Sequence, residues 1–507
     1  MLAPLSVSVA LLAATPGAKV WSEYQEKWSG RLTPLLSEVL RFPTLGDDTQ
    51  AIAAQRAWLD RVGGELGFTV RHRETMSEVD LPGPPGAPIL GLVVHGDVQP
   101  VNPSEWSVPP FSGVVKDGQV WGRGAADDKG PLVQALLVMA ALRSSQLPRT
   151  HTVRLLVGTD EERGATDVEE YVKKYPLPDL ALVLDSDFPV VVGEKAWAEW
   201  LVSARERPSG QGPGPVEVVD LVAGLSTGIV PDRAALTLRW RKGTPEWDRW
   251  LQPILAVKLP PGTTLEVQGT GDRRTLVTHG RAAHAGTSLA QGRNALVALA
   301  IAVDGRLPTS AAADLLAYAK QAGRDTHGGG LGLTVNDPLW GGVDTNVARV
   351  MREGDGPLTL VINLRSPPPF FGDALKQKVE AHAQSFAAAR GARFEFGGKF
   401  IFPPYVVAAD SPLVKRLLAA YARGTGVQRG PVVSAGGTYA QRLKNGVAFG
   451  MWFAEDGPYP GHAADERIPI ASLTRGVHVL SEALGDLATS PPMENPLQAP
   501  AAKSGTR

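Results

Sequence analysis

Hydrophobic positions in the first part of the chain form short continuous runs rather than an alternating pattern. The runs Ile89–Val94, Val153–Val157 and Leu180–Leu184 are almost wholly apolar, which is typical of strands covered on both faces, as in a parallel sheet. Between the first two runs, apolar residues recur at helical spacing over residues 131–140, beginning at a proline that favours the first turn of a helix. Strands that alternate with helices in this way predict a doubly wound α/β layer.

The pattern changes at about residue 196. A stretch rich in glycine and proline, RPSGQGPGP at 207–215, is followed by amphipathic segments such as a strand at Ala234–Trp240 and a helix at Ser310–Lys320. These features predict an α+β domain that is inserted into the first domain and extends to about residue 400.

The α/β pattern returns after residue 400, with a helix at Leu413–Tyr421, an apolar run at Val447–Phe453 and a closing helix at Ser472–Leu487. The α/β domain is therefore predicted to be discontinuous. Because the last residues carry little apolar surface, they are predicted to form a disordered tail. The predicted boundaries are 21–195 and 401–488 for the α/β domain, 196–400 for the inserted domain and 489–507 for the tail.

The first 20 residues contain a short apolar stretch that ends in small residues, MLAPLSVSVALLAATPGAKV. This composition is typical of a secretory signal peptide, although no Lys or Arg precedes the apolar stretch. A helical N-terminus of a cytoplasmic protein fits the same residues, so a periplasmic or secreted location and a cytoplasmic one both remain open. Since no other segment has the roughly 20 apolar residues that a membrane span needs, we expect a soluble protein without a membrane span.

Composition excludes several classes of function. The formal net charge is −1, with 51 Lys and Arg against 52 Asp and Glu, so there is no surplus of positive charge to bind nucleic acid. The chain has no cysteine, which excludes disulfides, thiolate metal ligands and cysteine nucleophiles. Any metal must therefore be held by His, Asp and Glu.

Polar residues gather just after the apolar runs, which is where ligands bind in open α/β sheets. Several of them are types that bind metals or transfer protons. They are His95 and Asp97 after the first run, Glu161 and Glu162 after the second, Asp185 after the third, His462 after the run that ends at Phe453, and Asp127 and Asp128 before a helix.

Each of these groups is weak evidence alone, since Asp127 and Asp128 can also be explained as caps of the following helix. Together they place many carboxylates at one edge of one sheet, where they repel one another unless cations neutralise them. Two histidines and three carboxylates without a thiolate suit zinc, and such a set also holds manganese or cobalt. If one carboxylate bridges, five ligands supply three per ion, as in a hydrolytic two-metal site.

Four motifs occur in an order and spacing that resemble one family: GRGAADDKGP, TDEERG, DSDFPVVVGEKA and GGTYAQ. They are similar to those of the co-catalytic zinc peptidases of family M20, which include carnosine dipeptidases, aminoacylases and carboxypeptidase G. The resemblance covers about residues 20–485 and is closest to the bacterial dipeptidases of the peptidase V type. It implies an α/β fold with a doubly wound catalytic domain, an inserted α+β lid domain and two zinc ions per chain.

The resemblance implies a ligand for each metal position. His95 and Asp185 would bind one zinc, Glu162 and His462 would bind the other, and Asp127 would bridge both. In this family the peptide bond after the bridging aspartate is cis, and we expect the same between Asp127 and Asp128.

The resemblance also implies two residues that act beside the metals. Asp97 would accept a hydrogen bond from the imidazole of His95 and thereby fix its orientation. Glu161 would be the general base, because it neighbours a ligand without being one and can take a proton from the attacking water.

Substrate contacts are implied for the lid and for a glycine loop. His284, in GRAAHAGT, would stabilise the oxyanion, and Arg365, in VINLRSP, would bind the substrate carboxylate through its planar fork. Gly436, Gly437 and Thr438 would form a backbone pocket for the substrate, although a plain turn fits them too.

Two activities fit this centre: a dipeptidase, and a deacylase of N-acyl amino acids with the same metals. They differ in what recognises the amino-terminal side of the substrate, where a dipeptidase needs a carboxylate for the free amino group, and Asp187 is one candidate. An inactive binding protein of the same fold is disfavoured, because Asp97, Glu161 and all five ligands are present. The size of the lid favours a monomer, with a lid-mediated homodimer as the alternative.

Overall fold

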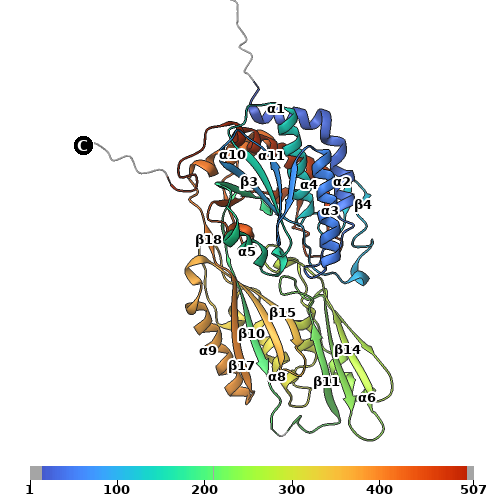
Figure 1. Ribbon diagram of the computed structural model, residues 1–507. Coiled ribbons are helices and arrows are strands. Elements are labelled where there is room, and N and C mark those ends of the chain that lie inside the picture. The colour runs from blue at the N-terminus through green and yellow to red at the C-terminus, as the bar shows by residue number, and fades with distance from the viewer. Residues whose placement is uncertain (1–13, 209, 500–507) are drawn as a thin grey trace, which may run out of the picture.

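The structure is a computed structural model that describes residues 14–208 and 210–499. Within these ranges the chain builds two bodies, each on a large sheet of its own (Figure 1). We call the upper one in Figure 1 the α/β body and the lower one the antiparallel body. The chain leaves the α/β body at β10, builds the antiparallel body up to β17, and then returns. The α/β fold predicted from the sequence is confirmed.

The α/β body is built on a nine-stranded sheet in the order β1-β2-β6-β3-β7-β20-β9-β18, with β19 paired to β9. Its centre is parallel, since β3 pairs in parallel with β6 and β7, and β7 with β20. The strands are β1 (Thr69–His72), β2 (Ser77–Leu81), β3 (Ile89–His95), β6 (Thr152–Gly158), β7 (Leu180–Val183), β9 (Val191–Glu194), β18 (Tyr405–Val406), β19 (Val432–Ser434) and β20 (Gly446–Ala448).

Helices cover both faces of this sheet, which explains the continuous apolar runs. In β3, Leu90, Leu92 and Val94 belong to the large core on one face, whereas Val93 belongs to a smaller core on the other face. The helices are α1 (Pro16–Glu23), α2 (Leu32–Val39), α3 (Thr49–Glu65), α4 (Lys129–Ser144), α5 (Thr166–Lys174), α10 (Pro412–Thr425) and α11 (Ile470–Thr489).

Helix α4 is the central helix of the large core. Residues 129–142 are all buried, because α4 packs against α1, α2, α11 and the sheet at the same time. Its first turn follows the loop that carries Asp127, so the packing of α4 holds that loop in place.

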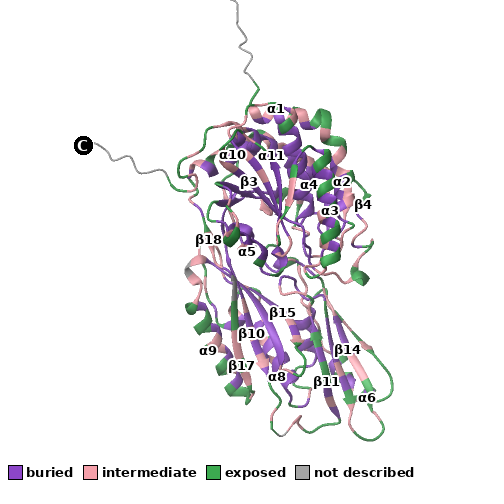
Figure 2. Ribbon diagram, viewed as in Figure 1, coloured by how far each residue is buried: buried purple, intermediate pink, exposed green. Residues whose placement is uncertain are grey.

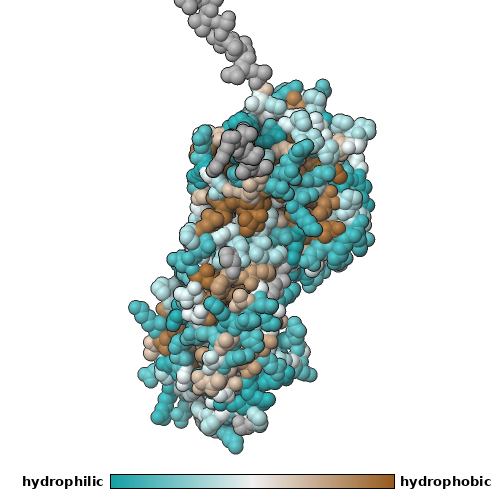
Figure 3. All heavy atoms as spheres, turned by 90° about the vertical axis from the view of Figure 1, so that its left-hand side faces the viewer, coloured by the Kyte–Doolittle hydropathy of each residue, from teal (hydrophilic) through white to brown (hydrophobic). Residues whose placement is uncertain are grey.

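The antiparallel body has an eight-stranded sheet in the order β13-β14-β12-β11-β15-β16-β10-β17. In β10, buried and partly exposed residues alternate, as in a sheet with one covered face. The surface seen in Figure 3 is mostly hydrophilic over this body, and helix α9 carries exposed residues on its outer side (Figure 2). The elements are β10 (Ala196–Ala204), β11 (Val216–Ala223), β12 (Arg233–Trp240), α6 (Trp247–Leu255), β13 (Thr264–Gln268), β14 (Arg273–His279), α7 (Ala295–Ala302), α8 (Ala311–Ala322), β15 (Asp344–Arg352), β16 (Leu358–Ser366), α9 (Asp373–Arg390) and β17 (Phe394–Phe402).

Two small sheets complete the α/β body. Strand β22 (Arg467–Pro469) pairs with β5 (Gln119–Trp121), which also pairs with β4 (Val114–Lys116). Strand β8 (Ser186–Asp187) pairs in parallel with β21 (Met451–Trp452). The apolar run at Val447–Phe453 is therefore two strands, β20 and β21, and not one. The chain turns between them at Gly450, whose φ of +74° suits glycine.

Residues 489–499 differ from the sequence-based prediction of a disordered tail at 489–507, whose last part, 500–507, lies outside the described residues. Met493 and Leu497 pack against the large core, and the backbone N–H of Leu413 donates to the carbonyl of Pro496 at 3.0 Å. The prediction was based on the small number of apolar residues in the tail. Two such residues are nevertheless enough to hold the segment against an apolar surface that the core leaves open. The described chain is thus packed close to residue 499.

The N-terminal segment with signal-peptide features lies partly outside the described residues, which begin at residue 14. Helix α1 starts at Pro16, and its Val20 is buried in the large core. Among the helices of residues 14–208 and 210–499, none combines the length and the apolar character needed to cross a membrane.

Candidate active site

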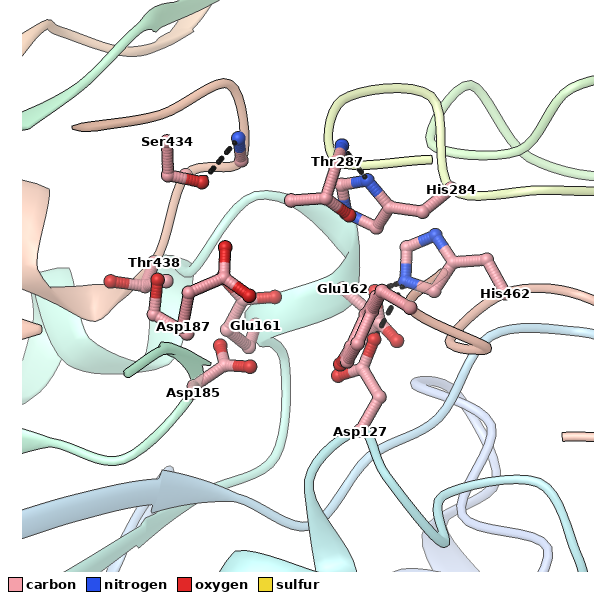
Figure 4. Close-up of a pocket in the computed structure, with 14 residues that line it drawn as sticks. Asp127, Glu161, Glu162, Asp185, Asp187, His284, Thr287, Ser434, Thr438 and His462 are labelled. Atoms are coloured by element: carbon pink, nitrogen blue, oxygen red, sulfur yellow. Dashed lines mark hydrogen bonds and ion pairs between the residues drawn. The ribbon is translucent and has the colours of Figure 1, made fainter. Parts of the chain in front are cut away.

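A pocket lies where the α/β body meets loops of the antiparallel body, beyond the carboxyl ends of β6 and β7 (Figure 4). Its empty space, including the part that is open to solvent, measures about 430 Å³. The α/β body contributes acidic residues and His462 to its lining, and the antiparallel body contributes His284 and Thr287. Most of the residues that the sequence singled out at the strand ends therefore share one site.

Asp127 lies at the centre of the predicted ligand set. Its Oδ1 is 3.0 Å from Nε2 of His95, and its Oδ2 is 3.1 Å from Nε2 of His462. The same nitrogen of His462 is 3.0 Å from Oε2 of Glu162, and Nε2 of His95 is 3.8 Å from Oδ2 of Asp185. The five side chains thus form two groups that share the two oxygens of Asp127.

The donor set fits two divalent cations. Among the described residues, Oε1 of Glu161 and Oε1 of Glu162 are buried without a hydrogen-bond partner. Burial raises the pKa of Asp185 and of Glu161, and neighbouring carboxylates add to the rise, so these acids crowd one another in the absence of cations. Nitrogen and oxygen donors within 4.8 Å of one another occur in the sets His95, Glu161, Asp185 and His95, Asp127, Glu162, and donors of this chemistry suit zinc, manganese or cobalt.

Asp97 supports the site differently from what the resemblance implies. Its carboxylate accepts hydrogen bonds from the backbone N–H groups of Glu161 and Glu162, at 3.2 and 3.1 Å. Nδ1 of His95 lies 3.0 Å from the backbone oxygen of Asp97 and 3.5 Å from its carboxylate. The carboxylate therefore holds the turn that carries the two glutamates, and the backbone oxygen is the nearer partner of the imidazole.

Asp128 is not the side-chain cap of helix α4. Its Oδ2 accepts a hydrogen bond from the backbone N–H of His95 at 3.1 Å, and its side chain makes no capping bond to the described first turn of the helix. The peptide bond between Asp127 and Asp128 is cis, as the resemblance implies. The hydrogen bond from His95 to the side chain of Asp128 therefore links the end of strand β3 to the loop that carries Asp127.

Glu466 is a buried carboxylate that sequence reasoning missed. It accepts hydrogen bonds from the backbone N–H groups of Gly124, Ala126 and Asp127, at 3.1, 2.9 and 3.2 Å, and from Nη1 of Arg123 at 2.6 Å. Its position four residues after His462 was the available signal. The segment 462–466 therefore acts on Asp127 twice: Glu466 binds its backbone N–H, and His462 contacts its carboxylate.

Gln99 is a second missed residue. Its Nε2 donates to Oε2 of Glu162 at 2.8 Å. It follows His95 and Asp97 at every second position, which was a visible pattern in a strand-like segment.

His284 reaches the pocket from the antiparallel body of the same chain. Its Nδ1 accepts hydrogen bonds from the backbone N–H groups of Gly286 and Thr287, both at 2.9 Å, so Nε2 carries the proton and is free to donate. Burial and the positive charges of His462 and Arg365 lower the pKa of His284 well below its usual value. The ring centroid lies 4.3 Å from that of His462. A neutral imidazole donor therefore lies beside the predicted ligands.

Arg365 is 2 % exposed and lies just outside the pocket lining. Its Nε donates to Asn363 at 3.2 Å, and its guanidinium lies 4.4 Å from the ring centroid of Trp197. Nη1 has no hydrogen-bond partner within the part of the chain that the structure describes. Burial lowers the pKa of Arg365 to about 10, which leaves it charged at neutral pH. A Cβ at Gly437 would lie 3.5 Å from Nη1, so this glycine lies directly beside the guanidinium of Arg365.

Gly436, Gly437 and Thr438 line the pocket, but the side chain of Thr438 is already engaged. Its hydroxyl donates to Oε1 of Glu194 at 2.9 Å, and its backbone N–H donates to Oε2 of the same residue at 3.1 Å. Burial raises the pKa of Glu194 to about 7. Glu194, which the sequence interpretation left without a role, thus positions the glycine loop, and its signal was the GEKA segment.

Comparison with known proteins adds a family match. The model of a family described as "Peptidase family M20/M25/M40" matches residues 91–486. The match includes all the residues discussed above as ligands or bases. It begins inside β3 and ends inside α11, so it covers both bodies.

Relatives and solved structures match over most of the chain. "Putative dipeptidase YtjP" of Bacillus subtilis (strain 168) is 28% identical over 462 residues, which cover 89% of this chain and 96% of that protein. "Putative dipeptidase SH1171" of Staphylococcus haemolyticus (strain JCSC1435) is 25% identical over 92% of this chain and 99% of that protein. The crystal structure of human carnosine dipeptidase 1 has a TM-score of 0.61 at 14% identity, over 94% of this chain and 100% of that chain. The dipeptidase Dug1p of Saccharomyces cerevisiae has a TM-score of 0.58 at 14% identity, over 94% and 99% of the two chains. These two structures share the fold.

Proposed function

The chain belongs to peptidase family M20/M25/M40, a family of hydrolases acting on peptide bonds, and from this premise we propose that it is a zinc-dependent dipeptidase. Its substrates are dipeptides with a free C-terminal carboxylate. The names of the relatives from Bacillus subtilis and Staphylococcus haemolyticus, both described as putative dipeptidases, support this choice among the activities of peptidases.

His95 and Asp185 would hold one zinc, Glu162 and His462 the other, and Asp127 both, since its two oxygens already contact the two histidines. When bound, the two ions supply Lewis acidity and lower the pKa of the hydrolytic water. Manganese and cobalt are compatible substitutes for the same donors.

Glu161 is the proposed general base. It accepts a proton from the hydrolytic water and passes it to the leaving amine. Its unpartnered Oε1 leaves one oxygen available for that proton. Asp97 acts through Glu161, because its carboxylate holds the backbone N–H of the base.

His284 and Arg365 act on the substrate. Nε2–H of His284 donates to the carbonyl oxygen as negative charge develops on it, a contribution of roughly 2.7–4 kcal/mol for one such donor. Nη1 of Arg365 binds the C-terminal carboxylate beside Gly437, the glycine that lies next to this nitrogen. Since His284 comes from the same chain, the site needs no partner subunit, and we propose a monomer as the active form.

The observation that carries the proposal is the contact of the two oxygens of Asp127 with two histidines, together with Oε1 of Glu161, which has no hydrogen-bond partner among the described residues. The test is hydrolysis of L-Ala-L-Ala, β-Ala-His, a tripeptide and N-acetyl-Met by the zinc-loaded protein, before and after chelation. We expect cleavage of dipeptides only, and its loss on chelation. Cleavage of N-acetyl-Met alone would replace the dipeptidase by the deacylase, and no cleavage at all would favour the inactive binding protein.

A further inference from the structure

Asp187 is a carboxylate of the pocket that the mechanism above does not use. It is the last residue of β8 and lines the pocket two residues after the ligand Asp185. It belongs to neither of the two groups of candidate metal ligands. In Figure 4 it lies on the same side of the pocket as Ser434 and Thr438, across from His284 and His462.

The backbone of Asp187 is held firmly on both sides. Its carbonyl accepts from the N–H of Gly450 at 3.3 Å, and the N–H of Phe188 donates to the carbonyl of Trp452 at 2.8 Å. The ring of Phe188 is buried, 4.5 Å from that of Phe453 and 5.3 Å from that of Phe449. The position of the carboxylate in the pocket is therefore set by the core beneath it.

The side chain of Asp187 has no hydrogen bond and no ion pair with any residue of 14–208 or 210–499. The cation that follows β9, Lys195, is taken by Asp344 at 2.6 Å. If the three carboxylate ligands and Glu161 are ionised, they carry as much negative charge as two divalent cations carry positive charge. The charge of Asp187 is then not needed to balance the charge of the two metal ions.

Arg365 supplies the complementary charge, and it is not paired with Asp187. The carboxylates whose negative charge most raises the pKa of Arg365 are Glu161, Asp344 and Glu199. Asp187 is not among them. One anion in the pocket and one cation beside it, which form no ion pair with each other in the described structure, match a zwitterion. An unmodified dipeptide is a zwitterion, with an ammonium group at one end and a carboxylate at the other.

We infer that Asp187 binds the α-ammonium group of the dipeptide, and thereby excludes substrates whose amino end is acylated or absent. The inference rests on the proposed dipeptidase function and deepens it, because it names the residue that separates a dipeptidase from a deacylase in this centre. Asp187 acts on the substrate and leaves the metals and the base unchanged.

The experiment compares L-Ala-L-Ala with propionyl-L-Ala, which has the same bond and no amino group. The zinc-loaded full chain is assayed as wild type, D187N, D187E and D410N. Asp410 is an exposed aspartate outside the pocket, so D410N removes one negative charge elsewhere. Zinc content and the thermal midpoint are measured for each protein. We also assay L-Ala-L-Lys, to separate an effect on the α-ammonium group from an effect on a basic side chain.

We expect D187N to lower kcat/KM for L-Ala-L-Ala by roughly 10- to 100-fold, as for the loss of one charged hydrogen bond. For propionyl-L-Ala the change should stay within about three-fold, because the group that Asp187 binds is missing from it. D187E should regain part of the lost preference, and D410N should behave as wild type. Zinc content and thermal midpoint should be the same in all four.

Three results would overturn the inference: a parallel loss for both substrates, which would indicate damage to the metal centre; no loss for either; or a loss confined to L-Ala-L-Lys, which would assign Asp187 to a side chain. The failure of the proposed function is distinguishable from these, because it appears in the wild type. If wild-type protein cleaves no dipeptide, both proposals fail. If it cleaves dipeptides and D187N keeps its preference for L-Ala-L-Ala, only the role of Asp187 fails.

Discussion

The two bodies contribute to the pocket in opposite ways. The α/β body supplies the acids and the two histidines of the predicted metal centre, from strand ends and loops at one edge of a parallel sheet. The antiparallel body supplies a neutral imidazole, His284, and a buried cation, Arg365, one from a loop after β14 and one from within β16. In the proposed mechanism the α/β body therefore binds the metals, transfers the proton and meets the ammonium end of the substrate, whereas the antiparallel body meets its carbonyl oxygen and its carboxylate.

Removal of the metal is expected to have the largest effect, because it disables the α/β body's part of the site as a whole. A chelator should abolish hydrolysis, and zinc should restore it. The thermal midpoint should fall too, because crowded carboxylates lose their cations; a metal present at about a thousand times its Kd stabilises by about 4 kcal/mol. The checks are activity and calorimetry on the same samples, and hydrolysis that persists in metal-free protein would refute the two-metal proposal.

Glu161→Gln is expected to have the second-largest effect. It should lower kcat by roughly 10²- to 10⁴-fold and leave the metal content unchanged. The matched control is Glu170→Gln on the exposed side of α5, where Glu170 forms an ion pair with Lys173. Steady-state kinetics and metal analysis check the prediction. Loss of zinc from the Glu161 variant would instead make this residue a ligand.

His284→Ala should lower kcat by roughly 10²- to 10³-fold with a small change in KM, because one donor to the oxyanion is lost. Its zinc content should remain that of wild type, in contrast to variants of His95 or His462. His279→Ala, a variant of another histidine of the antiparallel body that lies beside Glu266, is the control. Loss of zinc from the His284 variant would show that the antiparallel body also takes part in metal binding.

Arg365→Met tests whether the antiparallel body binds the carboxylate of the substrate. Because charged hydrogen bonds contribute about 1.5–3 kcal/mol, KM for L-Ala-L-Ala should rise by roughly 10- to 100-fold. Hydrolysis of L-Ala-L-Ala amide, which lacks the carboxylate, should change little. Arg249→Met replaces an exposed arginine of the same body and serves as the control. An equal loss for both substrates would show that Arg365 supports the fold around Trp197 and not the substrate.

The smallest effect is expected at the C-terminal end, away from the pocket. Leu497→Ala should lower the free energy of unfolding by about 1 kcal/mol, because the side chain is only partly buried against the core. Hydrolysis should stay at the wild-type level. Urea titration beside Gln498→Ala checks this, and equal stability of the two variants would return the segment to the disordered tail that the sequence predicts.

Prediction from the sequence was successful where a side chain's place follows from the end of a strand. Asp185 and Glu161 follow buried runs of a parallel sheet, and parallel strands end at one edge, so their proximity could be expected. The supporting residues could not be found in this way. Glu466 reaches the Asp127 loop from more than 300 positions along the chain, and Glu194 holds Thr438 across 244 positions. The two glutamates stand in recognisable segments, but their partners cannot be predicted locally, because these bonds depend on how distant loops meet.

The sequence by itself determined the order of strands and helices, the donor types available to a metal, and the edge of the sheet where they gather. The physical reason is that periodicity decides which face of an element is buried, and topology then decides where its ends lie. Only the tertiary structure decided that Asp97 holds the backbone of the two glutamates, that His284 reaches the site of its own chain, and that Asp187 has no partner among the described residues. These depend on distances between segments far apart in the chain, which burial patterns do not encode.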